Sequence, residues 1–191
     1  LGTARPAPWN VRHFELGNEP TELYRGDFDK SDAAKGYLKQ AAAMAVAMRS
    51  RAQSLGKTIE LKGVVETTFT LADWIKLVPM LARWNDIVLD PSSPLRSLAD
   101  QWKGNFYSAF TWSSSERELF EEVMAGGTTI VATADCIQKK LGKATPFWLT
   151  EYGVMVQKHR LFGGAEILLE RAKDFQAGLS DADILMSAMQ S

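Results

Sequence analysis

Cysteine is almost absent from this chain of 191 residues, and that scarcity excludes an internal disulfide. The single cysteine, Cys136, lies in a stretch with helical spacing, where a small buried residue is expected rather than a reactive thiol. Cysteine content therefore leaves the compartment undetermined. We expect a soluble protein and favour an extracellular one.

An excess of charge of one sign is also missing. Lys and Arg total 22 against 23 for Asp and Glu, which gives a formal net charge of −1. Without a basic stripe, nucleic acid is not expected as a partner. No stretch of about 18 apolar residues occurs, so no membrane-spanning helix is expected either. The length and the hydrophobic content of 46% suit one domain over residues 1–191, with a sizeable core.

Several common catalytic and cofactor-binding patterns are missing as well. The two histidines, His13 and His159, lie far apart, and no set of metal ligands with definite spacing accompanies them. The pair Gly126-Gly127 lacks the neighbours of a phosphate-binding loop, and no serine has the surroundings of a nucleophile elbow. We therefore expect neither a metal nor an organic cofactor.

The chain does contain an alternation of strand-like and helical segments. Short apolar runs predict strands at His13–Leu16, Thr58–Glu66, Asn105–Trp112 and Phe147–Tyr152. Apolar residues at three- and four-residue steps predict helices at Asp32–Leu55, Thr70–Leu77, Ser115–Met124, Thr129–Leu141, Ala165–Gln176 and Ser180–Met189. The stretch from Trp84 to Trp102 is expected to be irregular, and Gly126-Gly127 to interrupt a helix. This order favours a parallel sheet covered by helices, which binds ligands at the carboxyl ends of its strands.

Two glutamates stand where such a ligand site would form. Glu19 follows the first strand in Gly17-Asn18-Glu19-Pro20, where Pro20 is expected to hold Glu19 extended. Glu151 ends an apolar strand, where a carboxylate is costly to bury without a partner or a task. A retaining glycoside hydrolase requires such a pair, one acid and one ionised nucleophile, about 5–5.5 Å apart. A surface turn at Glu19 and a salt-bridged or solvent-facing strand end at Glu151 are the plainer alternatives.

Six tryptophans provide aromatic surface that suits either a core or a sugar ring. Core packing is favoured for Trp74, Trp84 and Trp148. Trp112 ends the third predicted strand, so it is the best candidate for contact with a sugar.

The segment Pro6–Pro20, with its ending Glu-Leu-Gly-Asn-Glu-Pro, resembles the fourth-strand region of the large clan of TIM-barrel retaining glycoside hydrolases. It is most similar to the α-L-arabinofuranosidase family and also resembles the heparanase-like β-glucuronidases. The resemblance implies that Glu19 is the general acid/base and that Asn18 contacts the sugar 2-hydroxyl. It also implies that Glu151, in Thr150-Glu151-Tyr152-Gly153, is the nucleophile at the end of the seventh strand.

The run Asn105–Trp112 resembles the sixth strand of that clan and departs from it at two positions. Phe110 stands where the family has a histidine, and Trp112 where it has the tyrosine that hydrogen-bonds the nucleophile. The resemblance thus implies a substrate-binding set of Asn18, Phe110, Trp112 and Tyr152. It implies an incomplete (β/α)8 TIM barrel with strands four to seven in this chain, completed by a missing barrel segment or by a homo-oligomer.

The function expected from these features is hydrolysis of a carbohydrate, a polysaccharide or oligosaccharide with arabinofuranoside, xyloside or glucan linkages. One alternative is a heparanase-like β-glucuronidase, for which Arg12, Arg25, Lys158 and Arg160 are candidates to bind a uronate. The other is a non-catalytic carbohydrate-binding protein, which the residues at positions 110 and 112 favour.

Overall fold

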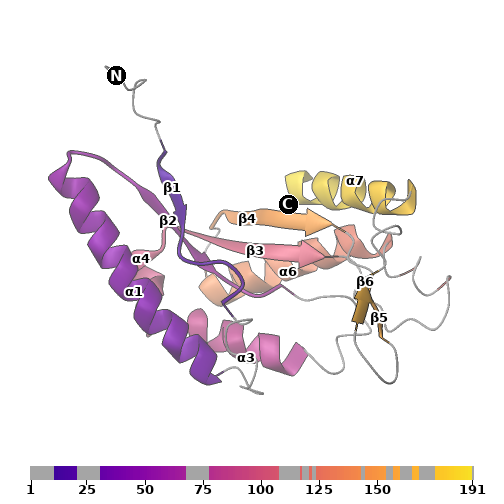
Figure 1. The fold of residues 1–191 in the computed structure, drawn as a ribbon, viewed down its shortest axis with the longest axis horizontal. Coiled ribbons are helices and arrows are strands. Elements are labelled where there is room, and N and C mark those ends of the chain that lie inside the picture. The colour runs from indigo at the N-terminus through magenta and orange to yellow at the C-terminus, as the bar shows by residue number, and fades with distance from the viewer. Residues whose placement is uncertain are drawn as a thin grey trace.

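The computed structural model describes residues 11–20, 31–67, 78–107, 117, 121, 124–142, 145–153, 157–159, 165–167 and 175–190. Its elements, in chain order, are β1 (His13–Glu15), α1 (Ser31–Ser54), β2 (Glu60–Val64), α3 (Val78–Val88), α4 (Leu95–Leu98), β3 (Gln101–Tyr107), α6 (Gly126–Leu141), β4 (Phe147–Gly153), β5 (Gln157–His159), β6 (Ala165–Ile167) and α7 (Phe175–Gln190). Figure 1 shows these elements along the chain.

Four of the strands form one all-parallel sheet in the order β1-β2-β3-β4. A helical crossover separates each pair of neighbours, as parallel pairing requires: α1 before β2, α3 and α4 before β3, and α6 before β4 (Figure 1). The two short strands β5 and β6 pair with each other in an antiparallel ribbon. The expected parallel sheet with covering helices is therefore confirmed.

The expectation of a (β/α)8 TIM barrel is wrong. Within the described part of the chain, β1 and β4 each pair with one neighbour, and no strand connects them. Strands β5 and β6 bond to each other instead of extending the sheet. A barrel closes only when its last strand bonds to its first. The fold is therefore an α/β fold with an open, half-barrel sheet of four strands and five described helices.

Helix α1 lies within one residue of its predicted bounds at each end. Its buried residues recur at the spacing of one helix face: Ala33, Ala34, Tyr37, Ala41, Ala45 and Ala52. Gly56, with a φ of 63°, follows the helix in the left-handed conformation typical of a helix end. The Val64 N–H donates to the Tyr37 hydroxyl at 2.8 Å, which ties α1 to the sheet.

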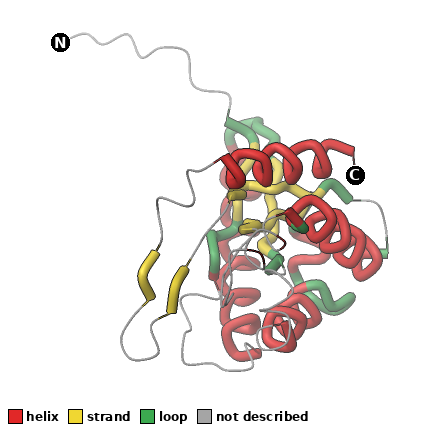
Figure 2. The backbone as a smooth tube through the Cα atoms, turned by 90° about the vertical axis from the view of Figure 1, so that its right-hand side faces the viewer, coloured by secondary structure: helices red, strands yellow, loops and turns green. Residues whose placement is uncertain are grey.

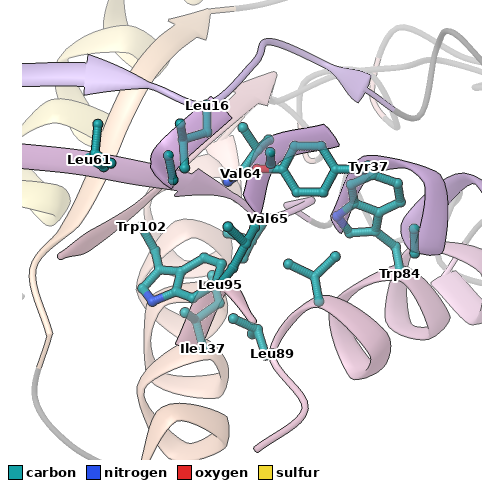
Figure 3. Close-up of a cluster of buried hydrophobic side chains, with 14 of the residues drawn as sticks. Leu16, Tyr37, Leu61, Val64, Val65, Trp84, Leu89, Leu95, Trp102 and Ile137 are labelled. Carbon is teal, nitrogen blue, oxygen red and sulfur yellow. Dashed lines mark hydrogen bonds between the residues drawn. The ribbon is translucent and has the colours of Figure 1, made fainter. Parts of the chain in front are cut away.

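The main hydrophobic core lies between the sheet and helices α1, α3, α4 and α6 (Figure 3). Leu61, Trp84 and Trp102 are at most 2% exposed there, so the prediction of Trp84 as a core residue is confirmed. A smaller cluster joins Phe106 of β3 to Ile130 of α6 and Ile184 of α7. Figure 2 shows the helices gathered around the sheet.

Four predictions about elements are wrong, in their bounds or in their type. Strand β3 begins at Gln101 rather than Asn105, and helices α3 and α4 lie within or overlap the stretch expected to be irregular. Gly126-Gly127 forms the first turn of α6, because the Asp183 carboxylate of α7 accepts the Gly127 N–H at 3.1 Å. Ala165–Ile167 is a strand, since it pairs with β5. The helix predicted at Thr70–Leu77 lies outside the described residues.

Two side chains expected to be buried are exposed. Cys136 lies on the outer side of α6, between buried positions Ala134 and Ile137. Trp148 is 41% exposed, because strand alternation turns it away from the core. Its indole instead lies under the Lys62 ammonium, 4.1 Å from the ring centroid, and beside the ring of His13.

Alternation along the strands gives the sheet two unlike faces. One face carries Leu61, Trp102 and Phe106 against the helices. The other face carries polar side chains at Glu15, Lys62, Lys103, Asn105 and Glu151. Among the helices that the structure describes, none is long and apolar enough to span a membrane.

Candidate active site

The loop after β1 holds Glu19 in an unusual backbone conformation. Gly17 has a φ of 110°, which favours glycine, and Glu19 has a φ of 42°. The expectation that Pro20 keeps Glu19 extended is therefore wrong. A left-handed residue with a side chain costs of order 1–3 kcal/mol, so surrounding contacts must maintain it. Pro20 is buried, and Asn105 Nδ2 donates to Glu19 Oε1 at 3.0 Å, which holds the carboxylate against β3.

Glu151 extends from β4 as an exposed side chain, and among the described residues its hydrogen-bond partner is Tyr107. The Tyr107 hydroxyl donates to Glu151 Oε2 at 2.7 Å. Burial, this hydrogen bond, and the negative charges of Glu151 and Glu19 raise the pKa of Tyr107 well above its ordinary value. The phenol therefore stays protonated at neutral pH and remains a donor to the carboxylate.

A β-bulge decides which face of the sheet Glu151 occupies. Gly104 pairs with Leu149, yet the next residue, Asn105, pairs with Glu151 because the register shifts between Gly104 and Asn105. Without this shift, Asn105 would pair with Thr150, and Glu151 would pair with Phe106 and share its helix-covered face. The bulge thus brings Glu151 to the polar face, beside Asn105 and Tyr107.

The two candidate carboxylates therefore meet the same short piece of β3. Asn105 hydrogen-bonds Glu19 through its side chain and lies opposite Glu151 in the strand register. Tyr107 binds Glu151 directly and is close enough to Glu19 for that charge to raise its pKa. Residues from two distant parts of the sequence thus converge on one polar site at the carboxyl ends of β1, β3 and β4.

Asn18 belongs to the same site. Its Oδ1 accepts hydrogen bonds from Lys103 Nζ at 2.6 Å and from Asn105 Nδ2 at 3.2 Å. Two donors on the oxygen fix the orientation of the amide, so its Nδ2 group is directed away from them. Asn18 is an exposed residue, so that group can donate to a bound hydroxyl.

The remaining predicted binding residues do not join this cluster. Tyr152 follows Glu151 and pairs with Phe106, so alternation places it on the opposite face of the sheet from the carboxylates. Its side chain is 41% exposed there. Phe110 and Trp112 lie outside the described residues.

Three functional candidates were missed from the sequence: Lys103, Asn105 and Tyr107. They alternate along β3, so all three project from the polar face. Polar groups at every second residue from Gln101 to Tyr107, alternating with Trp102, Gly104 and Phe106, are a signal that could have revealed them. The expected start of the strand at Asn105 hid this pattern.

Other kinds of site find less support. Within the described ranges, no group of three or more His, Cys, Asp or Glu side chains is placed to hold a metal ion. A surface hollow of about 410 Å³ lies by the C-terminal end of α1, lined by Arg49, Gln53 and Lys57 among others. The carboxylates of Glu19 and Glu151 are not among its lining residues, so we place the chemistry at the polar site.

Searches of protein-family models, curated proteins and solved structures each found no match for this chain.

Proposed function

We propose that this protein is a retaining glycoside hydrolase, with Glu19 as the general acid/base and Glu151 as the nucleophile. The observation that carries the proposal is the convergence of these two glutamates on Asn105 and Tyr107, on one polar face of the sheet. The resemblance of Glu15-Leu16-Gly17-Asn18-Glu19-Pro20 to the acid/base segment of such enzymes supports the same roles.

Glu151 begins the reaction as a carboxylate. Its Oε2 accepts the Tyr107 hydroxyl, so the other oxygen is available to attack the anomeric carbon. The bond from the anomeric carbon to the leaving oxygen breaks as Glu19 transfers its proton to that oxygen. The product of this step is a glycosyl ester on Glu151 and a released alcohol.

The second step restores the enzyme. Glu19, now ionised, takes a proton from water while the water oxygen attacks the anomeric carbon and the ester bond to Glu151 breaks. Asn105 Nδ2, 3.0 Å from Glu19 Oε1, holds the carboxylate in place through both steps. With Asn18 Oδ1 bound to Lys103 and Asn105, its Nδ2 group would donate to a sugar hydroxyl beside the reacting carbon.

Among the described residues, the charges around the site favour a neutral sugar over a uronate, and the uronate-binding candidates Arg25 and Arg160 lie outside the described residues. Lys103 is the cation that touches this cluster in the described part of the chain, and Glu15 pairs with it at 3.2 Å. Its side chain is 1% exposed, so it is not available to a substrate carboxylate. We therefore propose an arabinofuranoside, xyloside or glucan as the substrate class.

Mechanism-based labelling tests the proposal. A panel of 2-deoxy-2-fluoro glycosyl fluorides should form a stable ester on one peptide, and mass spectrometry should locate it at Glu151. The variant Glu151→Gln should take no label. Glu121→Gln removes an exposed carboxylate paired with Arg117 and should label like the wild type.

Two outcomes would contradict the proposal. Label on a residue other than Glu151 would exclude the assigned nucleophile. Absence of label with every sugar, together with retained binding of an oligosaccharide, would instead favour the non-catalytic carbohydrate-binding alternative.

A further inference from the structure

Lys103 is the most deeply buried charged side chain near the proposed site, and the reaction described above gives it no role. Its side chain is 1% exposed, and its ammonium touches Glu15 Oε2 at 3.2 Å, Asn18 Oδ1 at 2.6 Å and Asn105 Oδ1 at 3.4 Å. A buried charge is costly unless it is paired and hydrogen-bonded. These partners meet that requirement, and two of them belong to the site.

The contacts of Lys103 determine how two carboxamides are turned. An ammonium only donates, so each amide must present its oxygen to it. Asn105 Oδ1 also accepts the Thr150 hydroxyl at 3.0 Å, a contact that is compatible with this orientation. The Nδ2 group of Asn105 is therefore directed at Glu19 Oε1, as observed.

The opposite amide orientation of Asn105 would be unfavourable at its contacts with Lys103 and Glu19. The Asn105 oxygen would then face the Glu19 carboxylate, and its NH₂ group would face the ammonium of Lys103. Like partial charges would meet at both ends, and hydrogen bonds of a buried residue would be lost. One buried ammonium thus favours the amide geometry that holds the proposed acid/base.

We propose that Lys103 is a positioning residue for Glu19, acting through the amides of Asn105 and Asn18. This inference rests on the proposed glycosidase function for its catalytic consequence. The geometric part, the orientation of two amides by one ammonium, is independent of any reaction. Lys103 does not touch the reacting atoms in this scheme, so its removal should affect turnover more than substrate binding.

The test replaces Lys103 with methionine, which keeps the length of the side chain and removes its charge. In Lys103→Met, kcat should fall by up to about 100-fold with a smaller change in KM, since misplacing a reacting group by about 1 Å has an effect of that size. Lys62→Met is the matched control, because Lys62 is a 5% exposed lysine on the same face whose described contact is the ring of Trp148. It should keep wild-type kcat.

A double-mutant cycle separates positioning from general damage to the fold. If Lys103 acts through Asn105, the loss of kcat in Lys103→Met/Asn105→Ala should equal that of the more impaired single variant. Losses that multiply would overturn the proposal. Because Lys103→Met leaves Glu15 without its cation, Glu15→Gln/Lys103→Met is made as well. This variant removes both charges and serves if the single variant does not fold.

A second readout needs no activity. The side-chain NH₂ signals of Asn105 and Asn18 in a ¹H–¹⁵N spectrum, assigned with the Asn→Ala variants, should shift and exchange faster with solvent when Lys103 is replaced. Unchanged amide signals would overturn the inference, as would wild-type kcat in both Lys103 variants. A wild-type protein that labels with no glycoside would contradict the proposed function alone, while the amide signals still test Lys103.

Discussion

At the scale of single residues, Tyr107 is the side chain that links the two glutamates most directly. It donates to Glu151 and experiences the charge of Glu19. In the sequence, Trp112 occupies the position at which the resembled family has a tyrosine bound to the nucleophile. The structure supplies a tyrosine five residues earlier in the chain, on the strand itself. Under the proposed function, Tyr107 takes the part that this tyrosine has in the resembled family.

Replacing Tyr107 with phenylalanine removes this donor and little else. A hydrogen bond to a charged group contributes about 1.5–3 kcal/mol, so kcat/KM for a glycoside should fall roughly 10- to 100-fold. Steady-state kinetics measure the loss, and circular dichroism checks that the fold is retained. Tyr152→Phe is the control, because that ring lies on the opposite face and the variant should retain wild-type kcat/KM. A greater loss of kcat/KM in Tyr152→Phe than in Tyr107→Phe would place the site on the opposite face of the sheet.

At the scale of elements, glycine allows β2 and β3 to lie against the core. A Cβ on Gly63 would stand 2.6 Å from Trp102 Cζ3, and Trp102 is 2% exposed. On β3, a Cβ on Gly104 would meet Thr67 Cγ2 at 2.7 Å, next to the bulge that turns Glu151 toward the site. The close packing of these strands thus requires positions without a side chain.

Gly63→Ala should destabilise the protein by roughly 1–3 kcal/mol, the usual effect of overpacking a filled core. The measurement is a guanidinium unfolding curve followed by circular dichroism. Gly178→Ala is the matched control, because nothing lies within 4 Å of a Cβ at this position of α7. It should leave the midpoint unchanged or raise it, since alanine favours helix. A midpoint for Gly63→Ala at or above that of the wild type would show that the indole moves aside freely.

The elements also show which parts of the structure can be predicted from local sequence. Helix α1 follows from its apolar spacing, which a helix of any fold would share. The start of β3 cannot be predicted in this way. A buried strand accommodates the charge of Lys103 only because Glu15 and Asn18, from a distant segment, bind its ammonium. The start of α6 depends on Asp183, a residue of another helix. Contacts between distant segments decide both cases.

At the scale of the whole molecule, the barrel prediction was wrong for the same reason: local sequence does not reveal contacts between distant segments. Alternating strands and helices indicate a parallel sheet, and that part is confirmed. The number of strands and the closure of the sheet depend on which edge strands pair with further strands, and a local sequence pattern does not predict that pairing. Glu19 and Glu151 both hydrogen-bond side chains of β3, because the carboxyl ends of parallel strands lie at one edge of the sheet. The bulge that places Glu151 on the correct face has no signal in the sequence.

The stability of the molecule should depend on pH in the alkaline range through two of its tyrosines. Burial raises the pKa of Tyr37 far above its ordinary value, and the charge of Glu66 adds to the effect, while the Val64 N–H opposes it. The pKa of Tyr107 is raised as well. Above about pH 10, tyrosines of the unfolded chain lose their protons, while these two keep theirs in the folded state. The folded state then binds more protons, so the free energy of unfolding falls as the pH rises.

Tyr37→Phe separates the contribution of one tyrosine. Below pH 10 the variant should be less stable than the wild type by about 1–3 kcal/mol, because the Val64 N–H loses its buried acceptor. Between pH 10 and 11.5 its stability should fall less steeply than that of the wild type, since one group with a raised pKa is gone. Guanidinium unfolding at a series of pH values measures both effects. Parallel decreases in the two proteins would mean that the Tyr37 hydroxyl ionises as readily in the folded state as in the unfolded chain, contrary to its burial between α1 and the sheet.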